Sequence, residues 1–220
     1  MSHISAARGG VRELLADRAY DELRDRIVTL QIAPGSPIDE DLVGDQLGMG
    51  RTPVREAIKR LALENLVTVF PRRGTFASEI NITDLAQISD VRVQLEGHAA
   101  RRAAQRLTPE GRDELQALLD ALDEAQRAAD HQTLMELDAS VHRLVHRAAA
   151  NPYLEETLNR YFNLSLRIWY LVLDRLPHVG ARVHEHRELL CAIADGEPDR
   201  AHDVMVAHVE TFEREIRAVL

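Results

Sequence analysis

The sequence predicts a mainly α-helical protein in two parts, the first of which carries one small β-hairpin. Three observations predict this fold class. Apolar residues recur at helical spacing through most of the 220 residues. One pair of β-favouring segments flanks the run Pro71-Arg72-Arg73-Gly74, and no strand pattern follows residue 82. We therefore expect a small mixed part followed by an all-α bundle.

The first part opens with an expected helix over residues 11–31, which the turn residues 34–37 end. A short amphipathic helix is expected over residues 39–47, and a tight turn over residues 48–50 joins it to a second helix. We expect Thr52 to be the N-cap of the second helix and Pro53 its first helical residue. Its apolar residues share one face, and the other face is basic: Arg51, Arg55, Lys59 and Arg60.

The hairpin after this helix pair is expected from residues 66–70 and 75–77. Its tip carries Arg72, Arg73 and Gly74. A basic second helix followed by a basic hairpin is typical of a winged helix-turn-helix that contacts DNA. We therefore assign residues 1–76 to a DNA-binding domain and residues 77–82 to a linker.

The charge distribution agrees with this assignment, although the chain as a whole is acidic with a net charge of −9. Residues 1–76 hold 11 basic and 11 acidic residues, so the acidic excess lies in residues 77–220. From Arg51 to Arg73 there are six basic residues and two acidic ones. This local excess suits contact with phosphate groups.

Composition excludes two other classes of protein. The longest apolar run is far shorter than the roughly 18 residues that a membrane-spanning helix needs, so no membrane partner is expected. Cys191 is the only cysteine, which excludes an intrachain disulfide, and the N-terminus has no hydrophobic signal core. We expect a cytoplasmic protein.

The second part, residues 83–220, is predicted to be an all-α six-helix bundle. Thr108-Pro109 and Asn151-Pro152 are expected helix starts, and Asp195-Gly196 is an expected stop. The six expected helices cover residues 83–107, 109–130, 133–150, 152–174, 178–195 and 198–219.

Polar residues on the apolar faces of these helices are candidate metal ligands. Asp138 and His142 are four residues apart and share a helix face, and His186 and His208 lie on apolar stripes of two other helices. Buried carboxylates need partners, and neutral imidazoles bind divalent metals, so one shared ion would satisfy all four. Spacing also allows hydrogen-bonded core histidines instead, and it leaves other histidines as alternative ligands: His146, His178, His184 and His202.

Arg92 replaces an apolar residue in the stripe of the first helix of the bundle. A buried guanidinium needs an anion. Glu96, four residues further on, would form a structural pair, whereas the carboxylate of a small effector would make Arg92 a binding residue. Both interpretations stay open.

Several of these motifs together resemble a known family. Residues 27–76, with Ala33-Pro34-Gly35-Ser36, Arg51-Thr52-Pro53-Val54-Arg55-Glu56-Ala57 and the wing, resemble the DNA-binding domain of GntR-type transcription regulators. The remainder resembles the FCD-type effector domain of the FadR-like branch. Its signatures are Arg92 with Leu95-Glu96, Asp138 followed by His142 and Asn151-Pro152, and His186 with His208.

The resemblance implies a ligand set and DNA contacts. Asp138, His142, His186 and His208 would bind a divalent metal, with zinc expected first and nickel or manganese as alternatives, and Arg92 would hold a carboxylate effector beside it. Arg51, Thr52 and Arg55 would enter the major groove, with Arg72, Arg73 and Gly74 at the wing. Two positions depart from the family: Gly50 replaces a usual Ser or Thr, and Asp41 replaces an arginine found in some members.

We therefore expect a homodimeric, effector-controlled repressor that reads a short inverted repeat and is not an enzyme. A metal-dependent hydrolase is the first alternative, but it lacks a motif for a general base and leaves the basic hairpin unused. The second alternative keeps DNA binding and treats the bundle as a dimerisation module without a ligand.

Overall fold

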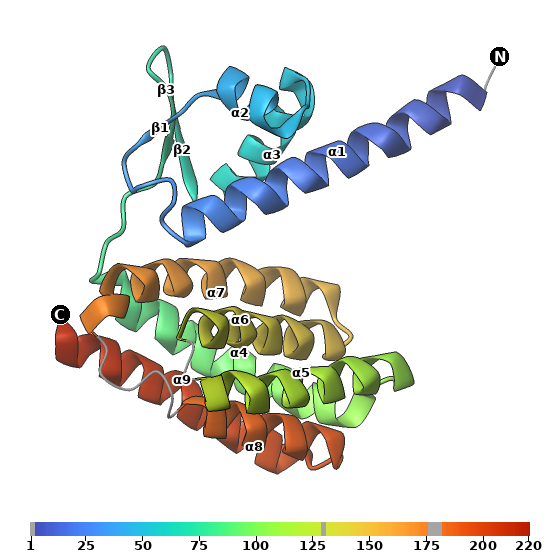
Figure 1. The fold of residues 1–220 in the computed structure, drawn as a ribbon, viewed down its shortest axis with the longest axis vertical. Helices are drawn as coiled ribbons and strands as arrows, with labels where there is room; N and C mark the ends of the chain where they lie inside the picture. Colours follow the sequence, from blue (N-terminus) through green and yellow to red (C-terminus); the bar gives the residue numbers. More distant parts are fainter. Residues whose placement is uncertain (1–2, 129–130, 176–181) are drawn as a thin grey trace. The chain divides into compact units, whose positions relative to one another are not determined.

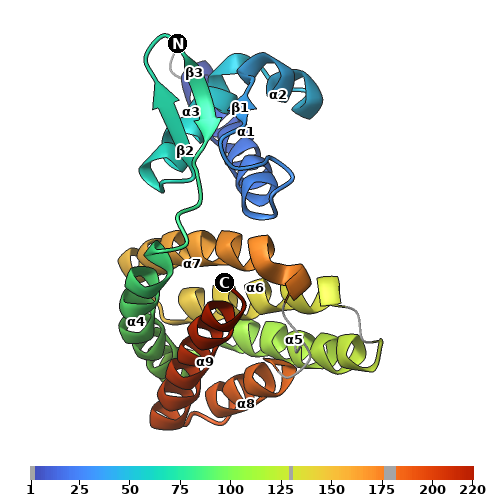
Figure 2. The same cartoon turned by 90° about the vertical axis from the view of Figure 1, so that its left-hand side faces the viewer.

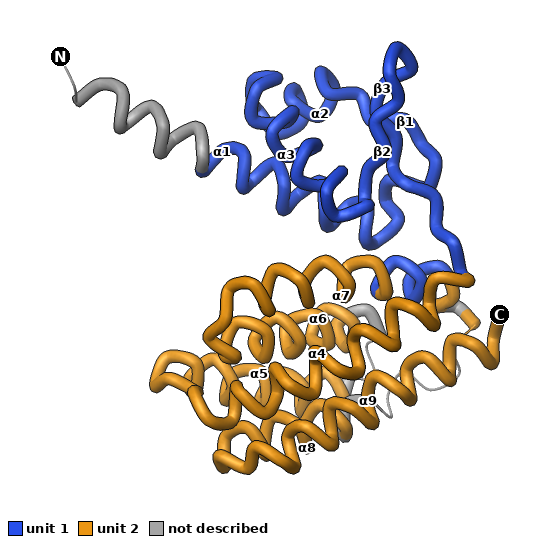
Figure 3. Tube along the Cα trace, turned by 180° about the vertical axis from the view of Figure 1, so that it is seen from behind, with its two compact units in different colours: residues 1–82, 166–171 blue, residues 83–165, 172–220 orange. Residues whose placement is uncertain are grey.

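The computed structural model describes residues 3–128, 131–175 and 182–220. The chain divides into two compact units (Figure 3). One comprises Met1–Ile82 with Leu166–Leu171, and the other comprises Thr83–Ser165 with Val172–Leu220. No helix among the described residues is both long enough and apolar enough to cross a bilayer.

Three helices build the first unit: α1 (His3–Val28), α2 (Glu40–Leu47) and α3 (Arg51–Leu63). Helix α3 packs along α1, and α2 packs on α3 (Figure 1). Helix α1 starts earlier than predicted and ends three residues sooner, because Leu30 adopts a left-handed backbone with φ of 61°. The apolar faces form a shared core, which includes Ala19, Leu23, Ile27, Val54, Ile58 and Leu61.

The turn between α2 and α3 depends on two glycines. Gly48 ends α2 in the left-handed region, with φ of 63°, where glycine carries no steric cost. At Gly44 a Cβ would lie 2.8 Å from the carbonyl oxygen of Met49, so only glycine allows this close approach. These contacts form the predicted tight turn.

The predicted start of α3 is wrong by two residues. The N-cap is Gly50, which offers no side-chain acceptor, and Thr52 is already helical. Pro53 still fits, because the first four N–H groups of a helix have no acceptor within it. The departure from Ser or Thr at residue 50 therefore removes a capping side chain.

The predicted hairpin is confirmed by β2 (Val67–Phe70) and β3 (Gly74–Ala77), which pair antiparallel. A third strand, β1 (Pro37–Ile38), pairs with the other edge of β3. The sequence did not predict β1, because two residues show no alternation. At the tip, Arg72 has φ of 64°, and Arg73 N–H donates to the Phe70 carbonyl oxygen.

All regular elements of the second unit are helices among its described residues, as predicted. Helix α4 packs along α9, and α6 contacts α4, α5 and α8 (Figures 1 and 2). The start of the fifth expected helix, at residue 178, lies outside the described residues. The helices are α4 (Asp84–Arg106), α5 (Pro109–Ala128), α6 (His131–Ala148), α7 (Pro152–Val172), α8 (Arg182–Ala194) and α9 (Pro198–Val219), with a 3-10 turn at Leu173–Arg175.

The expected helix starts and the expected helix stop are present in this unit. Asn151 Oδ1 accepts from Leu154 N at 3.3 Å, immediately before α7, and Thr108 Oγ1 accepts from Gly111 N at 3.1 Å at the start of α5. Gly196, with φ of 69°, follows α8. These capping contacts and the left-handed glycine mark where the helices begin and end.

Candidate metal centre and nucleic-acid interface

Four predicted ligands come together inside the helical unit. Asp138 and His142 lie on α6, His186 on α8 and His208 on α9, and one ligand atom from each lies within 4.8 Å of the others. None of the four residues is more than 3% exposed. Three helices thus supply one buried group of nitrogen and oxygen donors, the ligand types that zinc and similar ions take.

Two carboxylates fix the protons on two of these imidazoles. His142 Nδ1 lies 3.0 Å from Glu96 Oε2, and His208 Nδ1 lies 2.8 Å from Glu185 Oε2. An ionised carboxylate only accepts, so each Nδ1 carries the proton that it donates. Burial lowers the pKa of His142, and burial followed by repulsion from His186 lowers the pKa of His208 to about 4. Both rings are therefore neutral near pH 7.

The opposite nitrogens of these two rings face each other. His142 Nε2 and His208 Nε2 are 3.2 Å apart, and with protonated Nδ1 atoms both present lone pairs, which repel. A cation between them removes this conflict. Two nitrogens bound tetrahedrally to one zinc ion at about 2.05 Å would be about 3.3 Å apart, close to the spacing that the protein provides.

His186 gives a second sign of a missing partner. Its Nε2 is buried and lies 3.0 Å from Asp138 Oδ1, yet the direction does not suit a hydrogen bond, and this nitrogen has no hydrogen-bond partner among the described residues. Burial raises the pKa of Asp138, but His186, His142 and His208 outweigh it, and the net pKa lies below the usual range. An anionic oxygen and the nitrogens of three imidazoles therefore fit a divalent cation.

A second group shares His142 but is satisfied by hydrogen bonds. Glu96 Oε2 lies 2.9 Å from His146 Nε2, and His146 Nδ1 lies 2.8 Å from Asn159 Oδ1. Burial raises the pKa of Glu96, but His142, His146 and Arg92 outweigh it and hold that pKa well below its usual range. Both ring nitrogens of His146 therefore have an oxygen partner at hydrogen-bond distance, which His186 Nε2 lacks.

The other alternative histidines do not join either group in the described part of the chain. His202 pairs with Asp203 near the surface of α9. The side chain of His184, and all of His178, lie outside the described residues.

Arg92 forms the structural pair that the sequence left open. Its Nε and Nη2 donate to Glu96 Oε1 at 3.0 and 2.8 Å, and its Nη1 donates to Ser165 Oγ at 2.8 Å. The rings of Phe162 and Phe212 lie 5.2 and 5.7 Å from the guanidinium carbon. A guanidinium has five N–H donors, so these three bonds leave one N–H on each Nη for another acceptor.

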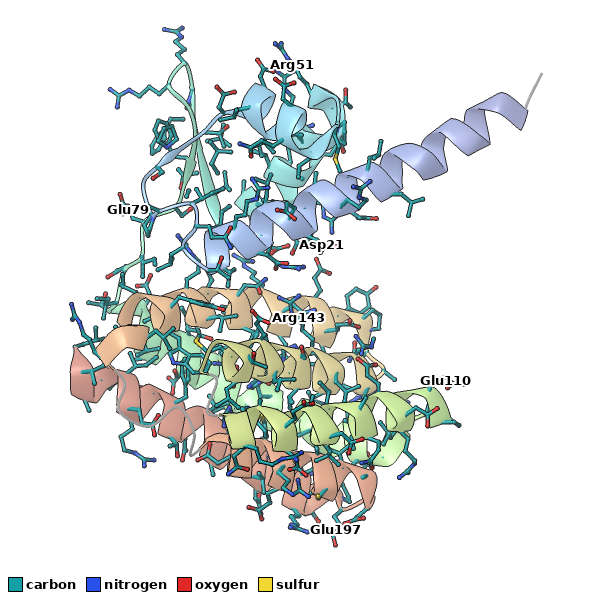
Figure 4. All side chains as sticks on the ribbon, viewed as in Figure 1. Asp21, Arg51, Glu79, Glu110, Arg143 and Glu197 are labelled. Atoms are coloured by element: carbon teal, nitrogen blue, oxygen red, sulfur yellow. The ribbon has the colours of Figure 1, made fainter. Side chains whose placement is uncertain are left out.

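The predicted DNA-contacting arginines divide into two groups by their partners. Arg51, at the start of α3 (Figure 4), is paired with Asp41, and Arg55 is paired with Glu40. Arg72 and Arg73 are exposed at the hairpin tip, and neither makes an ion pair within the described residues. Thr52 and Gly74 are exposed beside these two groups.

Lys59 and Arg60 lie further along α3. Lys59 is exposed and 3.9 Å from Glu56. Arg60 contacts α1, because its guanidinium lies 4.1 Å from the ring centre of Tyr20 and forms an ion pair with Asp17. Contact of these two residues with DNA stays a prediction.

Sequence reasoning missed the two carboxylates that orient the imidazoles of His142 and His208. The sequence predicts Glu96 only as a partner for Arg92, although its helical spacing of four from Arg92 signals a shared interior face where a carboxylate needs further donors. Glu185 lies 23 residues from His208, and at that separation no spacing rule predicts contact.

A basic winged helix-turn-helix followed in the chain by a helical unit with a buried group of possible metal ligands is typical of a transcription regulator. Residues 15–77 match the family described as bacterial regulatory proteins, gntR family, and residues 87–211 match the FCD domain. The chain therefore belongs to the GntR family of bacterial transcription regulators and carries an FCD domain. This confirms the family that the sequence predicted, and it confirms that the chain is a regulator and not an enzyme.

Individual relatives agree with this family. The chain is 26% identical over 200 residues to the HTH-type transcriptional repressor RspR of Escherichia coli, covering 91% of this chain and 88% of that protein. It is 27% identical over 201 residues to a probable D-xylose utilization operon transcriptional repressor of Paenarthrobacter nicotinovorans, with 91% and 88% covered. The structure of E. coli McbR/YncC shares the fold, with a TM-score of 0.80, 22% identity and 93% and 97% covered.

The protonation of His208 predicts how acid affects the metal-free protein. The unfolded chain takes up a proton on this residue near its ordinary pKa of about 6.5, whereas the folded imidazole stays neutral until about pH 4. Acid therefore favours the unfolded chain, and the free energy of unfolding should fall by about 3 kcal/mol between these two pH values. Urea denaturation with EDTA across this range measures the loss. His208→Gln should flatten the slope, and an unchanged slope would contradict the assignment.

Proposed function

We propose that the chain is a homodimeric repressor whose DNA-binding head, residues 1–76, is controlled by a small carboxylate bound at a divalent metal in residues 83–220. The metal proposal rests on one observation. The Nε2 atoms of His142 and His208 face each other, while carboxylates hold the protons on both Nδ1 atoms. Residues 77–82 are the linker. A cytoplasmic location follows for a bacterial protein that binds the chromosome.

Asp138, His142, His186 and His208 would hold the ion. Zinc suits three imidazoles and one carboxylate, and nickel or manganese accept the same donors. When bound, the ion supplies Lewis acidity and an open position for an effector oxygen. The carboxylates of Glu96 and Glu185 support this role, because partners on the second ring nitrogen hold a ligand imidazole in one orientation.

The hydrogen bonds of Arg92 support the proposal that the effector is a carboxylate. Its Nε side is bound to Glu96 and its Nη1 to Ser165, and one N–H on each Nη remains to donate to an effector carboxylate. Glu96 thus fixes the guanidinium without using its outer edge. The structural pair and the effector role, which the sequence set against each other, are compatible.

The head supports binding to double-stranded DNA through Arg51 and Arg55 in the major groove and Arg72 and Arg73 on the phosphates. A twofold dimer presents two recognition helices, so a short inverted repeat is the matching operator. Repression is favoured because the relatives above are named as repressors.

Control of DNA binding requires that the effector bind the two states of the dimer unequally. A hundredfold change in operator affinity corresponds to about 2.7 kcal/mol of coupling free energy. The effector must therefore favour the arrangement that does not fit the operator by at least this amount.

The metal assignment predicts a difference between two histidine variants. His186→Gln should weaken zinc binding by at least about 100-fold, more than the loss of an orienting partner usually causes. His146→Gln, in the hydrogen-bonded group, should change zinc affinity by less than about tenfold. Competition against a chromophoric chelator measures both, with circular dichroism as the check on folding. The reverse order would mean that Glu96, His142 and His146 bind the ion.

The effector role of Arg92 predicts a selective loss in Arg92→Lys, which keeps a cation beside Glu96 but lacks a second pair of donors. Zinc-loaded wild type should melt several degrees higher with at least one of acetate, lactate, malonate and citrate, since ligand at 100 times its Kd adds about 2.7 kcal/mol. The variant should show no such shift. A wild type that responds to no carboxylate would favour the bundle as a dimerisation module only.

The DNA assignment predicts that Arg55→Ala weakens operator binding by about 1–3 kcal/mol, because a bidentate contact to a base is lost. The operator is obtained by selecting bound duplexes from a random pool, and affinity is measured by fluorescence anisotropy. Arg127→Ala, which removes the same charge from α5, should leave affinity unchanged. Equal affinity in the two variants would remove Arg55 from the contact surface.

A further inference from the structure

The first turn of α2 carries three consecutive acidic residues, and each has a different partner. Asp39 is the N-cap, and its carboxylate accepts from backbone N–H groups of α2. Glu40 and Asp41 instead reach α3, where they contact Arg55 and Arg51. Two acidic side chains are therefore placed against the two arginines assigned to the major groove.

Both contacts use the same edge of the guanidinium. Arg51 bonds Asp41 through Nε and Nη2, the latter 2.8 Å from Oδ2. Arg55 bonds Glu40 Oε2 through Nε at 2.7 Å. The outer edge, formed by Nη1 and Nη2, has no other partner in the described part of the chain, and this is the edge that matches two acceptors side by side.

These ion pairs contribute little to folding. The side chains of Arg51 and Asp41 are 66% and 56% exposed, and exposed ion pairs of this kind typically contribute little to stability. Their effect on recognition is larger, because an unpaired arginine must give up its rotamer freedom when it binds a base. A carboxylate that already holds the side chain removes part of that loss before DNA arrives.

The wing shows the opposite arrangement. Arg72 and Arg73 have no carboxylate partner within the described residues. This suits cations that bind DNA phosphates regardless of the base sequence. A carboxylate beside Arg51 repels phosphate and weakens sequence-independent binding. The acidic residues of α2 therefore favour base contacts over phosphate contacts for the arginines that they touch.

We propose that Asp41 and Glu40 are specificity-determining residues, which hold Arg51 and Arg55 as forks that read guanine. Guanine is the base that presents two acceptors, O6 and N7, side by side in the major groove. Each operator half-site therefore contains a guanine opposite each fork. The inference rests on the proposed DNA binding and adds the base that each arginine recognises.

The experiment compares Asp41→Asn with Asp45→Asn. Asp45 is also exposed on α2, and its replacement changes the net charge equally without touching an arginine. A preferred duplex is first selected with the wild type, and dissociation constants are then measured by anisotropy for duplexes in which each guanine is replaced, at one salt concentration.

Replacing one guanine should weaken wild-type binding by about tenfold or more. Asp41→Asn should reduce that penalty to about twofold and bind random duplex more tightly, whereas Asp45→Asn should bind random duplex more tightly and keep the full penalty. Glu40→Gln should lose discrimination at a different guanine, the one opposite Arg55.

Two outcomes overturn the inference, and they are distinguishable. If Asp41→Asn discriminates as sharply as Asp45→Asn, the carboxylate contributes only charge, and the proposed DNA binding stands. If the wild type prefers no duplex, the proposed function itself fails, and the inference fails with it.

Discussion

The interior of the helical unit depends on one buried carboxylate. Glu96 has no exposed surface, and an ionised group in that position is strongly destabilising unless charge and hydrogen bonds compensate it. Arg92 supplies the permanent positive charge through Oε1, while His142 and His146 share Oε2. These bonds tie α4 to α6, and they decide which nitrogen of His142 is left to face the ligand group.

The ligand group is therefore organised by residues that are not ligands. Glu96 and Glu185 each hold an Nδ1 proton, so the Nε2 lone pairs of His142 and His208 point at one another. The repulsion between these lone pairs is a free-energy cost to the folded protein, and the proposed cation would remove it. In the proposed metal site, metal affinity and protein stability would accordingly be linked through the same atoms.

The sequence predicted the elements better than the contacts between them. Asn151 and Gly48 act where local backbone chemistry requires them, and helical spacing placed Asp138 with His142 on the interior face. The predicted start of α3 was wrong because its N-cap residue, Gly50, has no side chain, and no residue pattern marks such a cap. The partners of Glu96 and Glu185 depend on how helices distant in sequence rotate against each other, and a single sequence does not contain that information.

Arg51, Arg55 and Arg92 share one contact, in which a carboxylate binds the Nε side of the guanidinium. In the interior the carboxylate is required by electrostatics, because Arg92 could not be buried alone. At the surface water would solvate the cation without help, so the carboxylate contributes orientation instead. The same pairing therefore stabilises charge in one unit and sets direction in the other, and the exposure of the arginine decides which effect dominates.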